Sequence, residues 1–186
     1  MIYGGMILTV LILLIVVFAY LYNRLVSLKN RVDNAWSQIE VQLKRRHDLI
    51  PNLVETVRGY MEHERETLEA VIKARQQAVD IDQDNLADQA ESENFLSDTL
   101  RSLFAVTEDY PNLKANENFK ELQEELTSTE NRISFARQHY NDSVMRYNET
   151  QELIPYNFIV SFGDFAPREY FEIDDPTEKE APSVEF

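Results

Sequence analysis

The chain has 186 residues, of which 33 are Asp or Glu and 18 are Lys or Arg, so its formal net charge is -15. An acid excess of this size repels a phosphate backbone and argues against nucleic acid as a partner. The chain has no Cys, which excludes disulfides and thiolate chemistry. It has only four Gly and six Pro. Because these residues interrupt helices, their low number favours long helices. The length fits a single domain preceded by one membrane span.

The first segment, residues 1–23, is predicted to be a transmembrane anchor. No charged residue occurs from Ile2 to Tyr22, and about 20 helical residues at roughly 1.5 Å each cross a hydrocarbon layer about 30 Å thick. The segment lacks an N-terminal Lys or Arg and a small-x-small cleavage site, which argues against a cleaved signal peptide. Tyr3, Tyr20 and Tyr22 lie where interfacial aromatic residues are favoured.

Three cations follow this anchor and predict its orientation. Arg24, Lys29 and Arg31 flank its C-terminal end, whereas the N-terminal stub carries only its amino group. The excess of Lys and Arg on one side predicts an external N-terminus and a cytoplasmic domain. The same cations could contact anionic lipid headgroups, although their role as a topology signal is the favoured interpretation.

Residues 24–153 are predicted to form a helical bundle, because apolar residues recur three and four positions apart. The first stripe comprises Leu25, Leu28, Val32, Ala35 and Ile39, and its phase continues to Ala78 with polar interruptions at Gln42 and Arg46. Pro51 must kink this helix or end it. The preserved phase favours a kink and three long helices, whereas a turn at Pro51 would give four shorter helices.

The second half of the bundle is expected to return antiparallel toward the membrane. The polar stretch 81–92 predicts a loop, helicity resumes at Phe95, and Pro111 interrupts it again. A coiled-coil-like seam then marks the last long helix. Its members are Phe119, Leu122, Leu126, Thr129, Ile133, Ala136, Tyr140, Val144 and Tyr147. The predicted fold class is therefore all-α.

An aromatic segment and an acidic tail follow the bundle. Residues 154–173 crowd large apolar side chains together, and a surface of this kind must be covered. The segment could fold back on the bundle, which is favoured, or it could dock on the membrane or on a neighbouring subunit. Phe158, Phe162 and Phe165 are the candidate oligomer or membrane contacts. Residues 174–186 have the composition of a solvated, flexible tail, which could also serve as a handle for a partner.

Motifs that carry chemistry are not evident, so we predict no catalytic, cofactor-binding or metal-binding residues and no enzymatic activity. His47 and His63 have acidic neighbours but lack the spacing of zinc ligands. The pairs Tyr140-Asn141 and Tyr147-Asn148 recur one heptad apart, which suggests packing inside the bundle rather than a binding site. The polar stretch 129–132 is predicted to fix helix register.

Three stretches together resemble the LemA family. They are KRRHDLIPNLVETVRGYMEHERETL from Lys44, YPNLKANENFKELQEELTSTENRISFARQHYNDSVMRYN from Tyr110, and IPYNFIVSFGDFAPREYFEID from Ile154. The resemblance covers nearly the whole chain, including the uncharged span, and stops before the tail beyond Asp175. It implies a bacterial inner-membrane protein with a short external N-terminus, a cytoplasmic helical bundle and no established activity.

Two functional hypotheses follow from the anchor, the bundle and this resemblance. Some LemA relatives are implicated in organising membranes, and others are encoded beside membrane proteases. The leading hypothesis is a membrane-anchored scaffold that forms homo-oligomers and organises the bilayer or partner proteins. The alternative is an adaptor or regulator of a membrane protease or an envelope-stress system, which would bind a different membrane protein. The two hypotheses differ in self-association.

Overall fold

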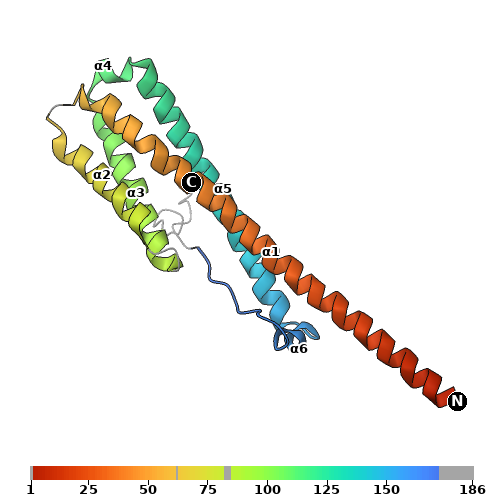
Figure 1. Cartoon of the computed structure of the whole chain (residues 1–186). Coiled ribbons are helices and arrows are strands. Elements are labelled where there is room, and N and C mark those ends of the chain that lie inside the picture. The colour runs from red at the N-terminus through yellow and green to blue at the C-terminus, as the bar shows by residue number, and fades with distance from the viewer. Residues whose placement is uncertain (1, 62, 82–84, 172–186) are drawn as a thin grey trace, which may run out of the picture. The chain divides into compact units, whose positions relative to one another are not determined.

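A computed structural model describes residues 2–61, 63–81 and 85–171 of the chain, and these residues form helices without any strand (Figure 1). The helices are α1 (Ile2–Arg58), α2 (Arg65–Asp80), α3 (Leu86–Thr107), α4 (Pro111–Lys114), α5 (Glu117–Glu152) and α6 (Tyr156–Val160). The predicted all-α class is confirmed. The chain divides into two compact units, the first comprising residues 1–40 and 135–170 and the second comprising residues 41–134 and 171–186.

The N-terminal part of α1 keeps its apolar side chains on the outside. Large apolar residues from Tyr3 to Tyr20 are exposed, and only 6% of the most apolar window is buried. The core helix of a soluble protein would bury such a surface. Among the described residues, α1 is the one helix long and apolar enough to cross a membrane.

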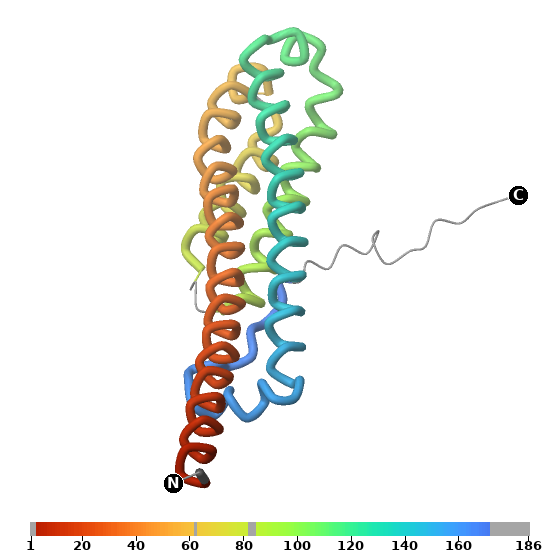
Figure 2. The backbone as a smooth tube through the Cα atoms, turned by 90° about the vertical axis from the view of Figure 1, so that its right-hand side faces the viewer, coloured from red at the N-terminus to blue at the C-terminus, as the bar shows by residue number. Residues whose placement is uncertain are grey.

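Beyond this apolar part, α1 buries a stripe within the first unit. The buried positions are Leu21, Leu25, Leu28, Val32, Ala35 and Ile39. The C-terminal half of α5 runs beside α1 in both views of this unit (Figures 1 and 2) and buries Ala136, Tyr140, Val144 and Tyr147. The ring centroids of Trp36 and Tyr140 lie 5.3 Å apart across this pair of helices. The three-and-four spacing of the sequence thus corresponds to a packed face.

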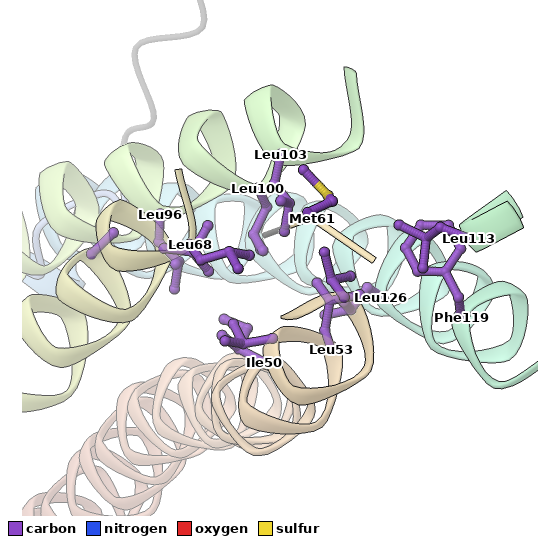
Figure 3. Close-up of a cluster of buried hydrophobic side chains, with 14 of the residues drawn as sticks. Ile50, Leu53, Met61, Leu68, Leu96, Leu100, Leu103, Leu113, Phe119 and Leu126 are labelled. Carbon is purple, nitrogen blue, oxygen red and sulfur yellow. The ribbon is translucent and has the colours of Figure 1, made fainter. Parts of the chain in front are cut away.

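The second unit contains its own apolar core, to which all its helices contribute (Figure 3). Ile50 and Leu53 come from α1, Leu68 from α2, Leu96 and Leu103 from α3. Leu113 of α4 and Phe119 and Leu126 of α5 also belong to the cluster. The α2 and α3 helices pack against each other in this unit.

The sequence predicts that the first helix of the bundle continues past Pro51 to about Ala78, and this extent is wrong, because α1 ends at Arg58 and α2 begins at Arg65. Pro51 lies inside α1 and does not end it. Proline cannot donate the backbone hydrogen bond that the carbonyl of His47 would otherwise accept. Nε of Arg75 donates to that carbonyl at 2.7 Å. A side chain from α2 therefore satisfies the group that Pro51 leaves free. The favoured continuation of the helix through Pro51 is confirmed, whereas the alternative of a turn at Pro51 is wrong.

The prediction of a loop over residues 81–92 is also wrong, because α3 begins at Leu86. Asn85 is its N-cap, and its side-chain oxygen accepts a hydrogen bond from the backbone of Asp88 at 3.2 Å. The side-chain nitrogen of Asn85 in turn donates to the carboxylate of Asp88 at 2.6 Å. This reciprocal cap satisfies a free amide at the helix start.

Candidate functional site

The aromatic segment after α5 folds back onto the end of the apolar part of α1, within the first unit. The chain turns after Glu152, forms α6 and then continues as Ser161 to Tyr170 (Figure 2). The ring of Phe162 meets Phe18 edge-on with a centroid distance of 5.6 Å, and Phe165 meets Tyr22 in the same way at 5.3 Å. These contacts anchor the segment beside the last turns of the span.

Gly163 allows this close approach. A Cβ atom at this position would lie 2.5 Å from the Phe165 ring and 3.2 Å from the Tyr22 ring. Distances this short cannot be accommodated without moving one of the rings. The absence of a side chain at residue 163 therefore lets Phe165 lie against Tyr22.

Two ion pairs continue the attachment farther along α1. Lys29 donates to the backbone carbonyl of Asp164 at 2.9 Å and lies 3.3 Å from its carboxylate. The guanidinium of Arg168 donates to Asp33 at 2.8 Å. The partners on α1 thus change from aromatic at Phe18 and Tyr22 to charged at Lys29 and Asp33. This order matches the change from apolar to aqueous surroundings at a membrane boundary.

Side chains of α5 hold the same segment from the other side. The amide of Asn148 pairs with both backbone groups of Arg168, donating to its carbonyl at 2.9 Å and accepting from its N–H at 3.0 Å. Tyr140 donates its hydroxyl to the carbonyl of Glu169 at 3.0 Å. Burial raises the pKa of Tyr140, which keeps the phenol protonated as a donor. The two Tyr-Asn pairs of the sequence thus include residues that fasten the returning chain.

The three predicted contact residues of this segment differ in exposure. Phe158 is 63% exposed and Phe162 is 70% exposed, whereas Phe165 is only 4% exposed. Phe165 therefore belongs to the packing against Tyr22 and is not available on the surface. The sequence could not separate these residues, since the partners of Phe165 lie more than a hundred positions away in the chain.

The predicted cations after the span also differ. Arg24 and Arg31 are exposed, as a contact with lipid headgroups would require. Lys29 is partly buried and binds Asp164. Because Lys29 is paired with Asp164, Arg24 and Arg31 are the exposed cations among these three residues.

A buried ion cluster lies in the second unit. Arg46 of α1 is 1% exposed and donates to the carboxylate of Glu93 of α3, which is also buried. The other guanidinium nitrogen donates to Glu130 of α5 and to Ser97 of α3, both at 2.6 Å. Nε2 of His47 lies 3.0 Å from Glu93. Residues from three helices therefore meet around one guanidinium.

Charge pairing keeps this cluster ionised despite its burial. Burial lowers the pKa of Arg46, but the carboxylates of Glu130 and Glu93 more than offset this effect and raise the pKa overall. Burial alone would raise the pKa of Glu93, whereas His47 and Arg46 lower it below its ordinary value. The cluster is therefore a network of ion pairs that joins α1, α3 and α5. Buried ion pairs of this kind can fix the register of packed helices.

The predicted seam of α5 is buried at Leu126, Ile133, Tyr140 and Tyr147, and Leu122 is partly buried against the apolar core. Of these residues, Leu122, Leu126 and Ile133 lie in the second unit, and Tyr140 and Tyr147 lie in the first.

A depression of about 690 Å³ near the start of α2 is lined mainly by Arg58, Met61, His63, Arg65 and Ile72. Within the described ranges, no group of three or more His, Cys, Asp or Glu residues has the arrangement of a metal site.

The N-terminal part of α1 is apolar and exposed, and helices follow it in the rest of the described chain. This combination is that of a membrane-associated helical protein. The chain belongs to the LemA family, whose family model matches residues 35–186. The match includes the acidic tail, so the prediction that the resemblance stops before the tail is wrong.

Curated relatives agree with this assignment. Protein LemA of Metamycoplasma hominis is 28% identical over 74% of this chain. The magnetosome protein MamQ 2 of Paramagnetospirillum magneticum is 24% identical over 81% of this chain, and MamQ of Magnetospirillum gryphiswaldense is 23% identical over the same share. The matches span 64% of the length of each of these relatives.

Proposed function

We propose that this protein is a membrane-anchored helical scaffold that self-assembles and organises the membrane or partner proteins. The observation that carries the proposal is the continuity of α1, in which the exposed apolar part and the buried stripe from Leu25 to Ile39 belong to one helix. An anchor joined to its domain by unbroken helix transmits position and orientation directly, because a helix bends far less than a flexible linker.

The ion pairs on unit 1 support this proposal, since they fix the returning segment against the same helix that enters the membrane. The relatives named as magnetosome proteins suggest a role at a cellular structure rather than in metabolism. On this proposal the protein has no catalytic activity of its own. An adaptor that regulates a membrane protease or an envelope-stress system would use the same anchor, but it would act as a single copy on a different protein.

The two proposed functions differ in self-assembly, because the scaffold forms homo-oligomers and the adaptor acts as a single copy. We expect detergent-free native nanodiscs to contain more than two copies of the full-length chain, as mass photometry can measure. Parallel copies in one membrane can repeat a lateral contact and close a ring. The net charge of -15 opposes this association, but screening over about 8 Å at physiological salt leaves close apolar contacts favourable.

The control uses two tagged forms of the protein that are either co-expressed or mixed after extraction. Co-purification only after co-expression would show assembly within the membrane rather than during extraction. Single copies in nanodiscs and in several detergents would contradict the scaffold proposal and favour the adaptor.

The orientation of the scaffold follows from the cations after the span. We propose that the N-terminus is external and that the helices beyond Arg24 are cytoplasmic, at the inner membrane of a bacterium. The chain has no Cys, so a single cysteine introduced at Glu117 reports its own location. We expect this cysteine to react with a membrane-impermeant maleimide only after the cells are lysed. Labelling in intact cells would reverse the orientation.

A further inference from the structure

The corner between α5 and α6 exposes apolar side chains in an otherwise acidic protein. No charged residue occurs from Leu153 to Gly163. Large apolar side chains in this stretch are exposed at Leu153, Ile154, Phe158 and Phe162, whereas Ile159 is buried. The corner therefore has an inner side that packs on the protein and an outer side that is apolar. Such an outer side marks an interaction surface.

The position of the corner along α1 indicates what covers it. A hydrocarbon layer about 30 Å thick needs about 20 helical residues, and the uncharged residues Ile2 to Tyr22 of α1 supply this length before the first charge at Arg24. The membrane must therefore reach close to Tyr22 if the whole span is to be covered. Phe18 lies about 9 Å before Arg24 along the helix, at a rise of roughly 1.5 Å per residue. Phe18 consequently lies inside the apolar layer or at its boundary.

Phe162 must lie at the same depth, because its ring is in edge contact with Phe18. Phe158 is one helical turn earlier in the chain, and the backbone of Phe162 is hydrogen-bonded to Ile159 between them. The fastening of the segment by Asn148 and Arg168 leaves it little freedom to move away from α1. The charged partners Lys29 and Asp33 meet the same segment on the aqueous side of Arg24.

We propose that the α5–α6 corner, residues 153–162, is a second membrane-contact site whose exposed side chains enter the lipid interface. Its ligand is the boundary between headgroups and acyl chains, where aromatic side chains are favoured. The bilayer would then hold unit 1 at two places, the span and the corner, which restricts tilting about the anchor. This proposal rests on membrane anchoring in the proposed function but not on self-assembly.

The absence of natural cysteines allows a nitroxide spin label at one chosen position of the full-length chain. Labels are placed at Phe158 and Phe162, in vesicles of phosphatidylcholine and phosphatidylglycerol, with accessibility to oxygen and to a water-soluble nickel complex measured by power saturation. Oxygen partitions into lipid and the nickel complex remains in water. We expect oxygen accessibility to exceed nickel accessibility at both positions, as it should for a reference label at Leu14 in the span.

The matched control is Phe135, another exposed phenylalanine of the first unit, which is 72% exposed. It precedes Leu153 by about 27 Å of helix at roughly 1.5 Å per residue, so its label should show the opposite, water-like ratio. Water-like ratios at Phe158 and Phe162 would overturn the proposal. Low accessibility to both reagents, with spin–spin broadening, would overturn it in favour of contact with a second copy. Assembly is measured separately by co-purification, so failure of one proposal does not imply failure of the other.

Discussion

Replacing Arg46 by Met is expected to destabilise the folded protein by about 3–5 kcal/mol, because the substitution leaves a buried carboxylate without its cation. Glu93 is almost completely buried, and its partners on α1 are Arg46 and His47. Urea unfolding of the full-length chain in mild detergent, followed by circular dichroism, measures the loss. The neighbouring variant Arg45→Met is the matched control. Arg45 pairs with Glu125 where both side chains are partly exposed, so its removal should cost at most about 1 kcal/mol.

The double variant Arg46→Met/Glu93→Met tests the pairing itself. Replacing both members of a buried ion pair by apolar residues can be neutral or stabilising, since the cost of desolvating two charges disappears. We therefore expect the double variant to be more stable than either single variant. The corresponding coupling energy between Arg46 and Glu93 is about 2 kcal/mol or more. Equal and additive losses would show that Arg46 and Glu93 act independently. A wild-type-like Arg46→Met variant would show that the cluster makes no net contribution to stability.

The same cluster explains why the sequence pattern of the first turns of α3 predicts a loop although the structure has a helix there. Gln89, Ser92 and Glu93 occupy buried positions, so the stretch lacks the apolar stripe by which a buried helix face is recognised. Glu93 is suited to its position only because Arg46 approaches from another helix, and no local pattern contains that information. A local signal was nevertheless present, since Asn85 and Asp88 have the spacing of a capping pair.

Pro51 shows the same limit for helix boundaries. The apolar phase correctly predicts that α1 continues through this residue. The same phase also predicts helix beyond Gly59, but α1 ends beside that residue, at Arg58. At this proline, Arg75 of α2 satisfies the carbonyl of His47, which has lost its helical donor. Uniform apolar stripes, by contrast, were sufficient to predict the buried residues of α1 from Leu25 to Ile39, since nothing beyond periodicity was needed there.

The aromatic segment was recognised by composition, but its division into buried and exposed residues was not predictable. Phe165 and Phe162 are three positions apart and chemically identical, yet one is buried against Tyr22 and the other is exposed. Gly163 between them allows the chain to approach Tyr22. Serine substitutions intended to test surface contacts should therefore be limited to Phe158 and Phe162, because Phe165→Ser would also remove buried packing.

Replacing Ile133 by Asp is expected to cost at least about 4 kcal/mol of stability, since the change removes a buried aliphatic side chain and introduces a charge without a partner. Ile133 is 3% exposed on α5. Phe135 lies two positions farther along the same helix and is 72% exposed, so Phe135→Asp adds the same charge at nearly the same place in the chain. Its effect should stay within about 0.5 kcal/mol.

Thermal unfolding of the two full-length variants in the same detergent compares them directly. Both add one negative charge to a chain that already carries -15, so general repulsion and any effect on helix propensity are nearly matched. A large fall in melting temperature for Ile133→Asp alone would therefore report burial of that position. Equal falls for both variants would point to charge repulsion, and an unchanged melting temperature for Ile133→Asp would mean that this part of α5 does not face a packed core.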